Sequence, residues 1–185
     1  MLKRLKQISW IRTLLTFSIV GLDQISKYLI QNYMMPSETV KLSSYLNFHL
    51  TYNKGITFGL LSQLNLDYYL LLLITLLPFA FLLYIYNIAK QNIQYNQYRK
   101  LHTMSYACAV GGGVGNLLDR ILQSKVTDFI DFHIGRWHFF TFNLADVSIV
   151  LGLLILCILI WLKGVTINIP ITRDPEKRTE LKHIA

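Results

Sequence analysis

Two aspartates, Asp128 and Asp146, open and close the segment VTDFIDFHIGRWHFFTFNLAD beside long apolar sequence. Two carboxylates that lie close together in a low-dielectric site cannot both ionise easily, so they share one proton. The charged member can then accept a proton from water, while the neutral member protonates or polarises a carbonyl group. This chemistry is peptide hydrolysis without a covalent intermediate. The alternative that the spacing leaves open is a pair of solvated carboxylates at a membrane interface.

A metal site is the second possibility for this segment, because Asp131 and His133 follow Asp128 closely. The sequence has no H-E-x-x-H motif and its five histidines are scattered, so it does not predict a catalytic zinc ion. In an extended segment, Asp131 is expected to face away from Asp128, since the two are separated by an odd number of positions. We therefore expect neither a metal nor another cofactor at the site.

Charged residues also interrupt the first apolar segment. Asp23 and Lys27 are separated by about one helical turn and can pair along one face of a helix. The pair either neutralises itself and holds the helix in a bundle or forms one wall of an active cleft. The sequence leaves both interpretations open.

A glycine-rich stretch, GGGVGNLLDR, combines close packing with polar groups. Gly111 and Gly115 follow the small-xxx-small pattern, which lets another helix backbone approach closely. Gly112, Asn116 and Arg120 fall on one helical face. The two polar members of that face can donate hydrogen bonds to a substrate carbonyl or to a lipid head group.

Simpler interpretations exist for some of these polar residues. Arg120 can pair with its neighbour Asp119 or extend outward to water. Asn53 and Gly55, at the end of an alternating segment, favour a turn, and turn formation alone would explain both residues.

The composition indicates an all-α membrane protein. Of the 185 residues, 53% are hydrophobic, and the mean hydropathy is +0.39. The apolar residues occur in blocks of about 20, which match the hydrocarbon thickness of a bilayer. The net charge of +8 comes from basic residues between apolar blocks, as in cytoplasmic loops, and no nucleic-acid-binding motif is present. We expect a bundle of four transmembrane helices at 11–30, 68–89, 101–122 and 144–162.

The distribution of lysine and arginine predicts the orientation of the spans. These residues cluster before the first span, between the second and third, and after the fourth. The positive-inside rule therefore assigns both termini to the cytoplasm. No cleavage pattern follows the basic N-terminus, so we expect it to be retained as the first span. Asp128 and Asp146 then lie at the same outer membrane surface, in contact with membrane lipids.

Two loops on the outer face are expected to be ordered. The segment YLNFHLTYN alternates apolar and polar residues, which predicts a strand with one apolar face. Trp137, Phe139 and Phe140 suit the interfacial belt of a membrane protein. We expect a small β-sheet and an interfacial segment on the outer, periplasmic face. Residues 1–165 should form one membrane domain, and 166–185 a polar cytoplasmic tail.

Two functions other than hydrolysis stay open on these residues alone. A non-catalytic assembly factor would use the glycine-rich face of the third span. A small proton-coupled transporter or channel would use ionisable groups within the spans, here Asp23, Lys27, Asp119 and Arg120. Such a conduit should have acidic groups at several depths, whereas the best carboxylate pair here lies at one surface.

The chain resembles the bacterial lipoprotein signal peptidases (signal peptidase II) over about Thr13 to Leu162. The resemblance rests on the four spans and on the ordered motifs Asp23–Lys27, NKGITFG, GGGVGNLLDRI, VTDFIDF and FNLAD. It implies an aspartyl endopeptidase of the bacterial inner membrane. Its substrates would be prolipoproteins whose lipobox cysteine carries a diacylglyceryl group, and cleavage would fall just before that cysteine.

The resemblance also implies roles for individual residues. Asp128 and Asp146 would be the catalytic pair, and Asp119 would be structural. No cofactor or metal ion is implied, and we expect a monomer that binds no nucleic acid. Around the cleft, the residues expected to bind substrate or support the active site are Asp23, Lys27, Asn53, Gly55, Gly112, Asn116, Arg120, Asn143 and Ala145.

Overall fold

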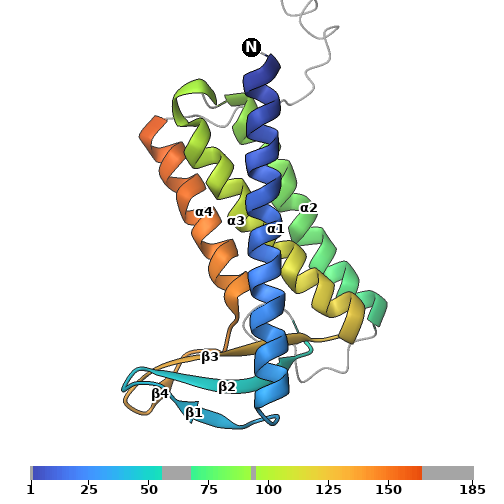
Figure 1. The fold of residues 1–185 in the computed structure, drawn as a ribbon, viewed down its shortest axis with the longest axis vertical. Coiled ribbons are helices and arrows are strands. Elements are labelled where there is room, and N and C mark those ends of the chain that lie inside the picture. Colours follow the sequence, from blue (N-terminus) through green and yellow to red (C-terminus); the bar gives the residue numbers. More distant parts are fainter. Residues whose placement is uncertain (1, 56–67, 93–94, 164–185) are drawn as a thin grey trace, which may run out of the picture.

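The computed structural model describes residues 2–55, 68–92 and 95–163 (Figure 1). Most of this length is helical, and each predicted span lies within one helix. The predicted tail, 166–185, lies outside the described residues. The helices are α1 (Leu2–Tyr33), α2 (Tyr68–Asn92), α3 (Tyr95–Gln123) and α4 (Leu144–Lys163).

Two of these helices, α2 and α4, are long and apolar enough to cross a membrane. Their spans, Tyr68–Ile88 and Leu144–Leu162, have mean hydropathies of 2.3 and 2.7. Only 6% and 22% of the residues in the most apolar windows are buried, so neither helix resembles the core of a soluble domain. Large apolar side chains are also exposed along α1, including Phe17 at 71%. Polar residues lower the hydropathy of α1 and α3, which is why these two do not stand out by composition.

Helix α3 contacts all three other helices and is the centre of the bundle. Gly111 allows its approach to α1, since a Cβ atom there would lie 2.9 Å from Cβ of Ile19. Gly112 allows the approach of α4, since a Cβ atom there would collide with the carbonyl oxygen of Ala145. The close helix packing predicted from the glycine-rich stretch is confirmed, and it involves two neighbouring helices.

Hydrogen bonds around Tyr86 join α2, α3 and α4 away from the sheet. The Tyr86 hydroxyl lies 2.6 Å from Oγ of Ser105 and donates to the carbonyl oxygen of Gly152 at 3.0 Å. Oγ of Ser105 donates to the same carbonyl at 2.6 Å. Because buried polar groups need partners, these contacts fix how the three helices are aligned along one another.

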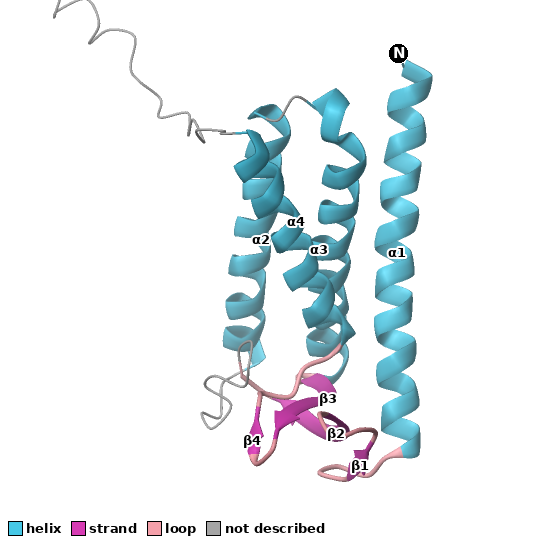
Figure 2. Cartoon of the chain, turned by 90° about the vertical axis from the view of Figure 1, so that its left-hand side faces the viewer, coloured by secondary structure: helices cyan, strands magenta, loops and turns pink. Residues whose placement is uncertain are grey.

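A small antiparallel sheet closes one end of the helical bundle, as Figures 1 and 2 show. Its order is β1-β2-β3-β4. The strand predicted within YLNFHLTYN is confirmed as β2, and the segment VTDFIDFHI that contains Asp128 forms the adjacent strand. The strands are β1 (Thr39–Lys41), β2 (Leu46–Asn53), β3 (Val126–Ile134) and β4 (Trp137–His138).

A register shift in β2 changes which of its side chains share a face with Asp128. Before the shift Phe48 pairs with Ile130, but beyond it Thr51 pairs with Asp128. A shift of one residue moves the side chains that follow it to the opposite face of the sheet. Asn53 therefore lies on the same face as Asp128. The strict alternation predicted for the whole strand is wrong beyond Phe48.

Candidate active site

Asp128 in β3 and Asp146 in the first turn of α4 meet around a single residue, Asn143. The side-chain Nδ2 of Asn143 donates to Oδ1 of Asp128 at 2.7 Å. The backbone N–H of Asn143 donates to Oδ2 of Asp146 at 3.2 Å. The structure thus brings the two predicted catalytic carboxylates together where β3 lies beside the start of α4, elements that Figure 1 shows at the sheet end of the bundle.

The start of α4 orients Asp146 through a capping box. Oδ1 of Asn143 accepts a hydrogen bond from the backbone N–H of Asp146 at 3.0 Å, and Asp146 returns a bond to the backbone of Asn143. The other carboxylate oxygen of Asp146 accepts from Nδ2 of Asn116 at 2.8 Å. The helix N-terminus favours negative charge at this position. Asp146 is therefore held by both oxygens, and these contacts oppose the cost of burying its charge.

Asp128 is buried and has a different environment. Its Oδ2 accepts from Nδ2 of Asn53 at 3.2 Å, and its Oδ1 accepts from Asn143. Burial, followed by the negative charge of Asp146, raises the pKa of Asp128 to about 7, although the two asparagine hydrogen bonds act in the opposite direction. Asp128 consequently retains a proton up to near-neutral pH.

Lys27 of α1 contacts one side chain of its own helix and two side chains of α3, close to the candidate catalytic pair. Its Nζ lies 2.8 Å from Oδ2 of Asp23, 3.1 Å from Oδ2 of Asp119 and 3.0 Å from Oδ1 of Asn116. The predicted pairing of Asp23 with Lys27 is confirmed, and Asp119 completes a buried charge cluster. Because Asn116 also contacts Asp146, this cluster both pairs the buried charges and supports the candidate site.

Asp23 also anchors the start of α4. Its Oδ1 accepts from the backbone N–H of Ala145 at 2.9 Å. Ala145 is fully buried, and its carbonyl oxygen lies against Gly112. Gly115 leaves space for the Asp23 carboxylate, since a Cβ atom there would lie 2.6 Å from Oδ2. Small residues are therefore required wherever α1, α3 and α4 meet around the candidate site.

Arg120 neither pairs with Asp119 nor extends outward to water. Its Nη1 donates to Oγ1 of Thr75 at 2.6 Å, and its Nη2 donates to the carbonyl oxygen of Gly55 at 2.6 Å. The side chain is buried, and among the described residues it forms no ion pair with Asp119. Both simple interpretations of Arg120 are therefore wrong. The guanidinium instead connects α3 to α2 and to the chain after β2.

Asn53 combines the predicted turn with a contact to Asp128. Its Oδ1 accepts from the backbone N–H of Gly55 at 2.9 Å, which confirms the turn. Its Nδ2 faces Asp128 because of the register shift in β2. The turn and the carboxylate contact are thus made by opposite ends of one amide.

Two further residues belong to this network but were not predicted, one through its side chain and one through its backbone. Nε2 of Gln24 donates to Oδ1 of Asp119 at 3.0 Å and to the carbonyl oxygen of Gly115 at 3.1 Å. The backbone N–H of Thr127 donates to Oδ2 of Asp119 at 3.0 Å, which agrees with the structural role implied for Asp119.

A local signal for the capping role of Asn143 was present in NLAD, where an N-cap residue precedes an acidic residue by three positions.

Asp131 takes no part in the contacts of Asp128 and Asp146. Its partners are His138, at 2.9 Å, and Asn47, at 2.8 Å. Burial opposes ionisation of Asp131, but these hydrogen bonds and the nearby histidines lower its pKa overall. The expectation that Asp131 faces away from Asp128 is confirmed.

An apolar groove begins beside Asp146 and follows α4. Its volume is about 580 Å³, and Asp146 is the acidic residue among those that line it. Its aromatic residues come from the segment after β4, in which Phe139 and Phe140 were predicted to lie at the membrane interface. The groove is lined by Phe139, Phe140, Phe142, Asp146, Val147, Val150, Leu151 and Leu154.

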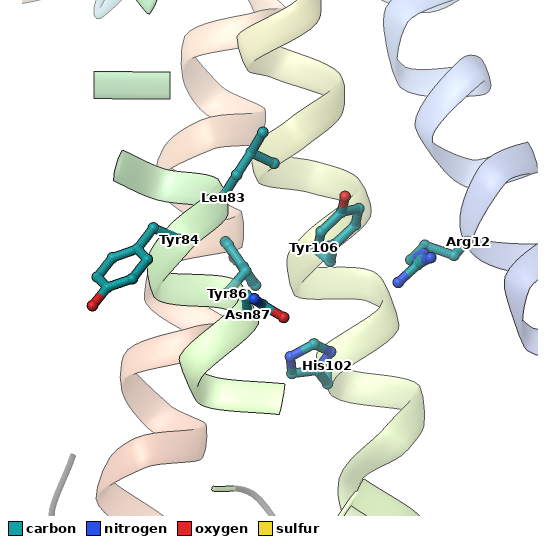
Figure 3. A pocket seen from close by; sticks show the side chains of 7 residues that line it. All are labelled: Arg12, Leu83, Tyr84, Tyr86, Asn87, His102 and Tyr106. Atoms are coloured by element: carbon teal, nitrogen blue, oxygen red, sulfur yellow. The ribbon is translucent and has the colours of Figure 1, made fainter. Parts of the chain in front are cut away.

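A second pocket lies toward the opposite end of the bundle and is shown in Figure 3. Cζ of Arg12 on α1 lies 4.7 Å from the ring centroid of Tyr106 on α3. His102 and Tyr86 line the same space, which has a volume of about 440 Å³. Neither carboxylate of the candidate active site contributes to this pocket.

The chain is similar to a known family of membrane peptidases. The family model described as signal peptidase (SPase) II matches residues 15–162. The lipoprotein signal peptidase of Francisella tularensis subsp. novicida (strain U112) is 38% identical over 143 residues, which cover 77% of this chain and 86% of the relative. The lipoprotein signal peptidase of Coxiella burnetii (strain Dugway 5J108-111) is 35% identical over 152 residues, which cover 81% and 89%.

Solved structures of bacterial membrane enzymes are also similar to this chain. One, determined by the in meso method at 2.3 Å resolution, has a TM-score of 0.63 and 26% sequence identity. The alignment covers 89% of this chain and 94% of that structure's chain. Another, at 1.9 Å resolution, has a TM-score of 0.64 and also 26% identity, over 80% and 90% of the two chains. The similarity therefore extends to a bacterial membrane enzyme fold.

Proposed function

The chain belongs to the signal peptidase II family and is a peptidase, and we propose that Asp128 and Asp146 are its catalytic pair. Family membership supports cleavage of signal peptides from prolipoproteins. The proposed cleavage falls just before the diacylglyceryl cysteine, at the outer surface of the bacterial inner membrane. The observation that carries the proposal is the contact of Asn143 with both carboxylates.

In the proposed reaction a water molecule lies between the two carboxyl groups. Asp146, as the carboxylate, takes a proton from the water molecule while the water oxygen attacks the scissile carbonyl carbon. Asp128, as the acid, donates its proton to the carbonyl oxygen. When the tetrahedral intermediate collapses and the C–N bond breaks, the proton on Asp146 passes to the leaving nitrogen and Asp128 recovers its own. No covalent enzyme intermediate forms.

The division of roles within the pair follows from the two environments. Asp146 lies at a helix N-terminus and accepts hydrogen bonds at both oxygens, and these contacts support its charged form against the opposing effect of burial. Asp128 is buried in the sheet, where its pKa of about 7 leaves a substantial protonated fraction near neutral pH. Groups whose environments differ in this way are suited to act as base and acid in one reaction.

The apolar groove beside Asp146 supports a lipid-modified substrate. Its lining is almost wholly aliphatic and aromatic, and Asp146 is the acidic residue at its edge. An acyl chain or the apolar part of a signal peptide lying there would bring the adjacent peptide bond to the carboxylates. The groove would also keep bulk water from the reacting bond.

We further propose that all four helices cross the membrane, with both termini in the cytoplasm and the sheet on the outer face. Helix α1 has 32 residues and is about 48 Å long at 1.5 Å per residue, which exceeds the roughly 30 Å of hydrocarbon. The buried carboxylates Asp23 of α1 and Asp119 of α3 are both paired with Lys27, so these charges have partners inside the bundle. In this arrangement residues 1–165 are one monomeric membrane domain that contacts lipid and 166–185 are a cytoplasmic tail.

A conduit for protons gains no support from the intramembrane charges. Asp23 and Asp119 each pair with Lys27 within one buried cluster. These three charges thus form one local group, whereas a relay needs ionisable groups at several depths.

The substrate can be tested with one purified precursor in two forms, with and without a diacylglyceryl group on its lipobox cysteine. Mass spectrometry of the products identifies the new N-terminus. We expect the lipid-modified form to yield a product that begins with the modified cysteine. Equal cleavage of both forms, or cleavage at another bond, would contradict the proposed specificity.

A further inference from the structure

Three potential metal ligands gather in the sheet, away from the proposed catalytic pair. They are Asp131 and His133 of β3 and His138 of β4, here called the sheet cluster. We propose that the sheet cluster binds a divalent transition-metal ion, with Zn²⁺ as the preferred ion. This site goes beyond peptide cleavage and does not depend on it. It also differs from the metal site considered from the sequence, because Asp128 is not a member.

Strand pairing explains why these residues meet. His133 pairs directly with His138, and Asp131 lies two positions before His133, so all three share one face of the sheet. Asn47 of β2 pairs with Asp131 and lies on the same face. Asp128 is on the opposite face, since it is separated from Asp131 by an odd number of positions. The sheet therefore separates the cluster from the catalytic pair.

The distances within the cluster are close to those of a metal site. The candidate ligand atoms of the three residues lie within 4.8 Å of one another. Tetrahedral Zn²⁺ at 2.0–2.1 Å from its ligands needs separations of about 3.4 Å. His138 can close this difference by rotation, because its side chain is 51% exposed. The two imidazole rings are stacked, with centroids 5.0 Å apart and an interplanar angle of 13°, so His138 must turn out of this stack for both rings to direct a nitrogen at one ion.

The other members of the cluster are buried and oriented. Asp131 is 4% exposed and His133 is 9% exposed. Nδ2 of Asn47 donates to Oδ2 of Asp131 at 2.8 Å and lies 3.4 Å from Nδ1 of His133. Hydrogen bonds of this kind hold a ligating carboxylate in position around a metal ion. Nδ1 of His138 lies 2.9 and 3.0 Å from the two oxygens of Asp131, so the two groups point toward each other and a metal ion would take the place of the hydrogen between them.

The ligand types select the class of ion. Two imidazoles and one carboxylate suit Zn²⁺ and its transition-metal neighbours, whereas Ca²⁺ and Mg²⁺ prefer oxygen ligands alone. Three protein ligands would leave a fourth position for water on the exposed side of His138. Because Phe139 and Phe140 follow His138 directly and line the groove, a bound ion would fasten the β3–β4 hairpin beside that groove.

The test uses the tag-free, full-length protein in detergent. Zn²⁺ is titrated calorimetrically, and Co²⁺ is used as a probe whose visible absorption reports tetrahedral ligands. We expect one ion per chain. His138→Asn and His133→Asn should each weaken Zn²⁺ affinity at least about 10-fold, and Asn47→Ala should weaken it about 10-fold through Asp131.

His49→Asn is the matched control, because His49 lies in the same sheet and its Nδ1 contacts Thr39 rather than the cluster. This variant should bind Zn²⁺ as the parent protein does. Zn²⁺ should also raise the melting temperature of the parent protein but not that of His138→Asn, whose melting temperature without metal should be unchanged. Failure to bind one ion per chain, or equal affinity in the parent and His138→Asn, would overturn the proposal.

Discussion

Nδ2 of Asn143 lies 2.7 Å from Oδ1 of Asp128, and this contact joins the sheet to the first turn of α4. Asn143 is also the N-cap of α4 and holds Asp146 through a reciprocal pair of hydrogen bonds. One residue therefore starts the helix, orients one carboxyl group and binds the other. Formation of α4 and assembly of the proposed catalytic pair depend on the same side chain.

The two roles of Asn143 can be separated by substitution. Asn143→Ala removes the cap and the contact with Asp128, so we expect a loss of about 1 kcal/mol of stability together with lower kcat. Asn143→Ser keeps a capping oxygen but is too short to reach Asp128, so stability should be retained while kcat falls. Thermal unfolding and single-substrate kinetics measure the two effects. Equal kcat in the parent protein and Asn143→Ser would show that the contact with Asp128 is dispensable.

The environment of Asp128 predicts how activity depends on pH. Burial and the charge of Asp146 raise its pKa from 3.8 to about 7, so the pair keeps its shared proton below about pH 7 and loses it above. We expect kcat/KM to fall as the pH rises through 7. A profile measured between about pH 5 and 9 that rises throughout would contradict this assignment.

The free energy of unfolding should also fall as the pH rises. The folded protein holds the proton of Asp128 more tightly than the unfolded chain does, because its folded pKa is the higher one. The stabilising contribution is therefore complete below about pH 4 and is lost as the pH rises through 7. Melting temperatures should fall over this interval for the parent protein, and the part of the slope due to Asp128 should disappear in Asp128→Asn.

Gly112 should tolerate no side chain. A Cβ atom there would meet the backbone carbonyl of Ala145, which cannot rotate away, so Gly112→Ala must displace the start of α4. We expect a loss of about 1–3 kcal/mol of stability and reduced kcat. Gly21→Ala is the control, because nothing lies within 4 Å of its Cβ position and alanine favours a helix. Similar melting temperatures for the two variants would contradict the packing described for α3 and α4.

The proposed orientation can be tested by cysteine labelling in spheroplasts. The background replaces Cys108 and Cys157 with serine, and single cysteines then replace Arg136, in the turn between β3 and β4, or Lys100, near the start of α3. A membrane-impermeant maleimide should label position 136 in intact spheroplasts and position 100 only after permeabilisation. The reverse pattern would invert the proposed topology.

Local patterns in the sequence were sufficient for much of the fold. The four helices followed from apolar blocks, β2 from alternation, and the pairing of Asp23 with Lys27 from helical spacing. Each of these features depends on residues close together in the chain. For the same reason, the glycine-rich stretch correctly indicated a close helix contact.

Features that depend on distant segments were not predictable in this way. The register shift in β2 arises from its pairing with β3, and it determines that Asn53 rather than its neighbour faces Asp128. The partners of Arg120 come from α2 and from the chain after β2, so no spacing within α3 could identify them. The sheet cluster likewise forms only when the β3–β4 hairpin brings His138 beside His133.

The most direct test of the proposed mechanism compares three aspartate-to-asparagine variants in a cleavage assay with a diacylglyceryl-modified substrate. Asp128→Asn and Asp146→Asn each remove one member of the pair with little change in shape, so kcat should fall by about 10²–10⁴-fold in both. Asp131→Asn, in the same strand but on the opposite face, should keep kcat within about 3-fold of the parent value. Near-normal kcat in either Asp128→Asn or Asp146→Asn, with normal melting temperatures throughout, would contradict the two-aspartate mechanism.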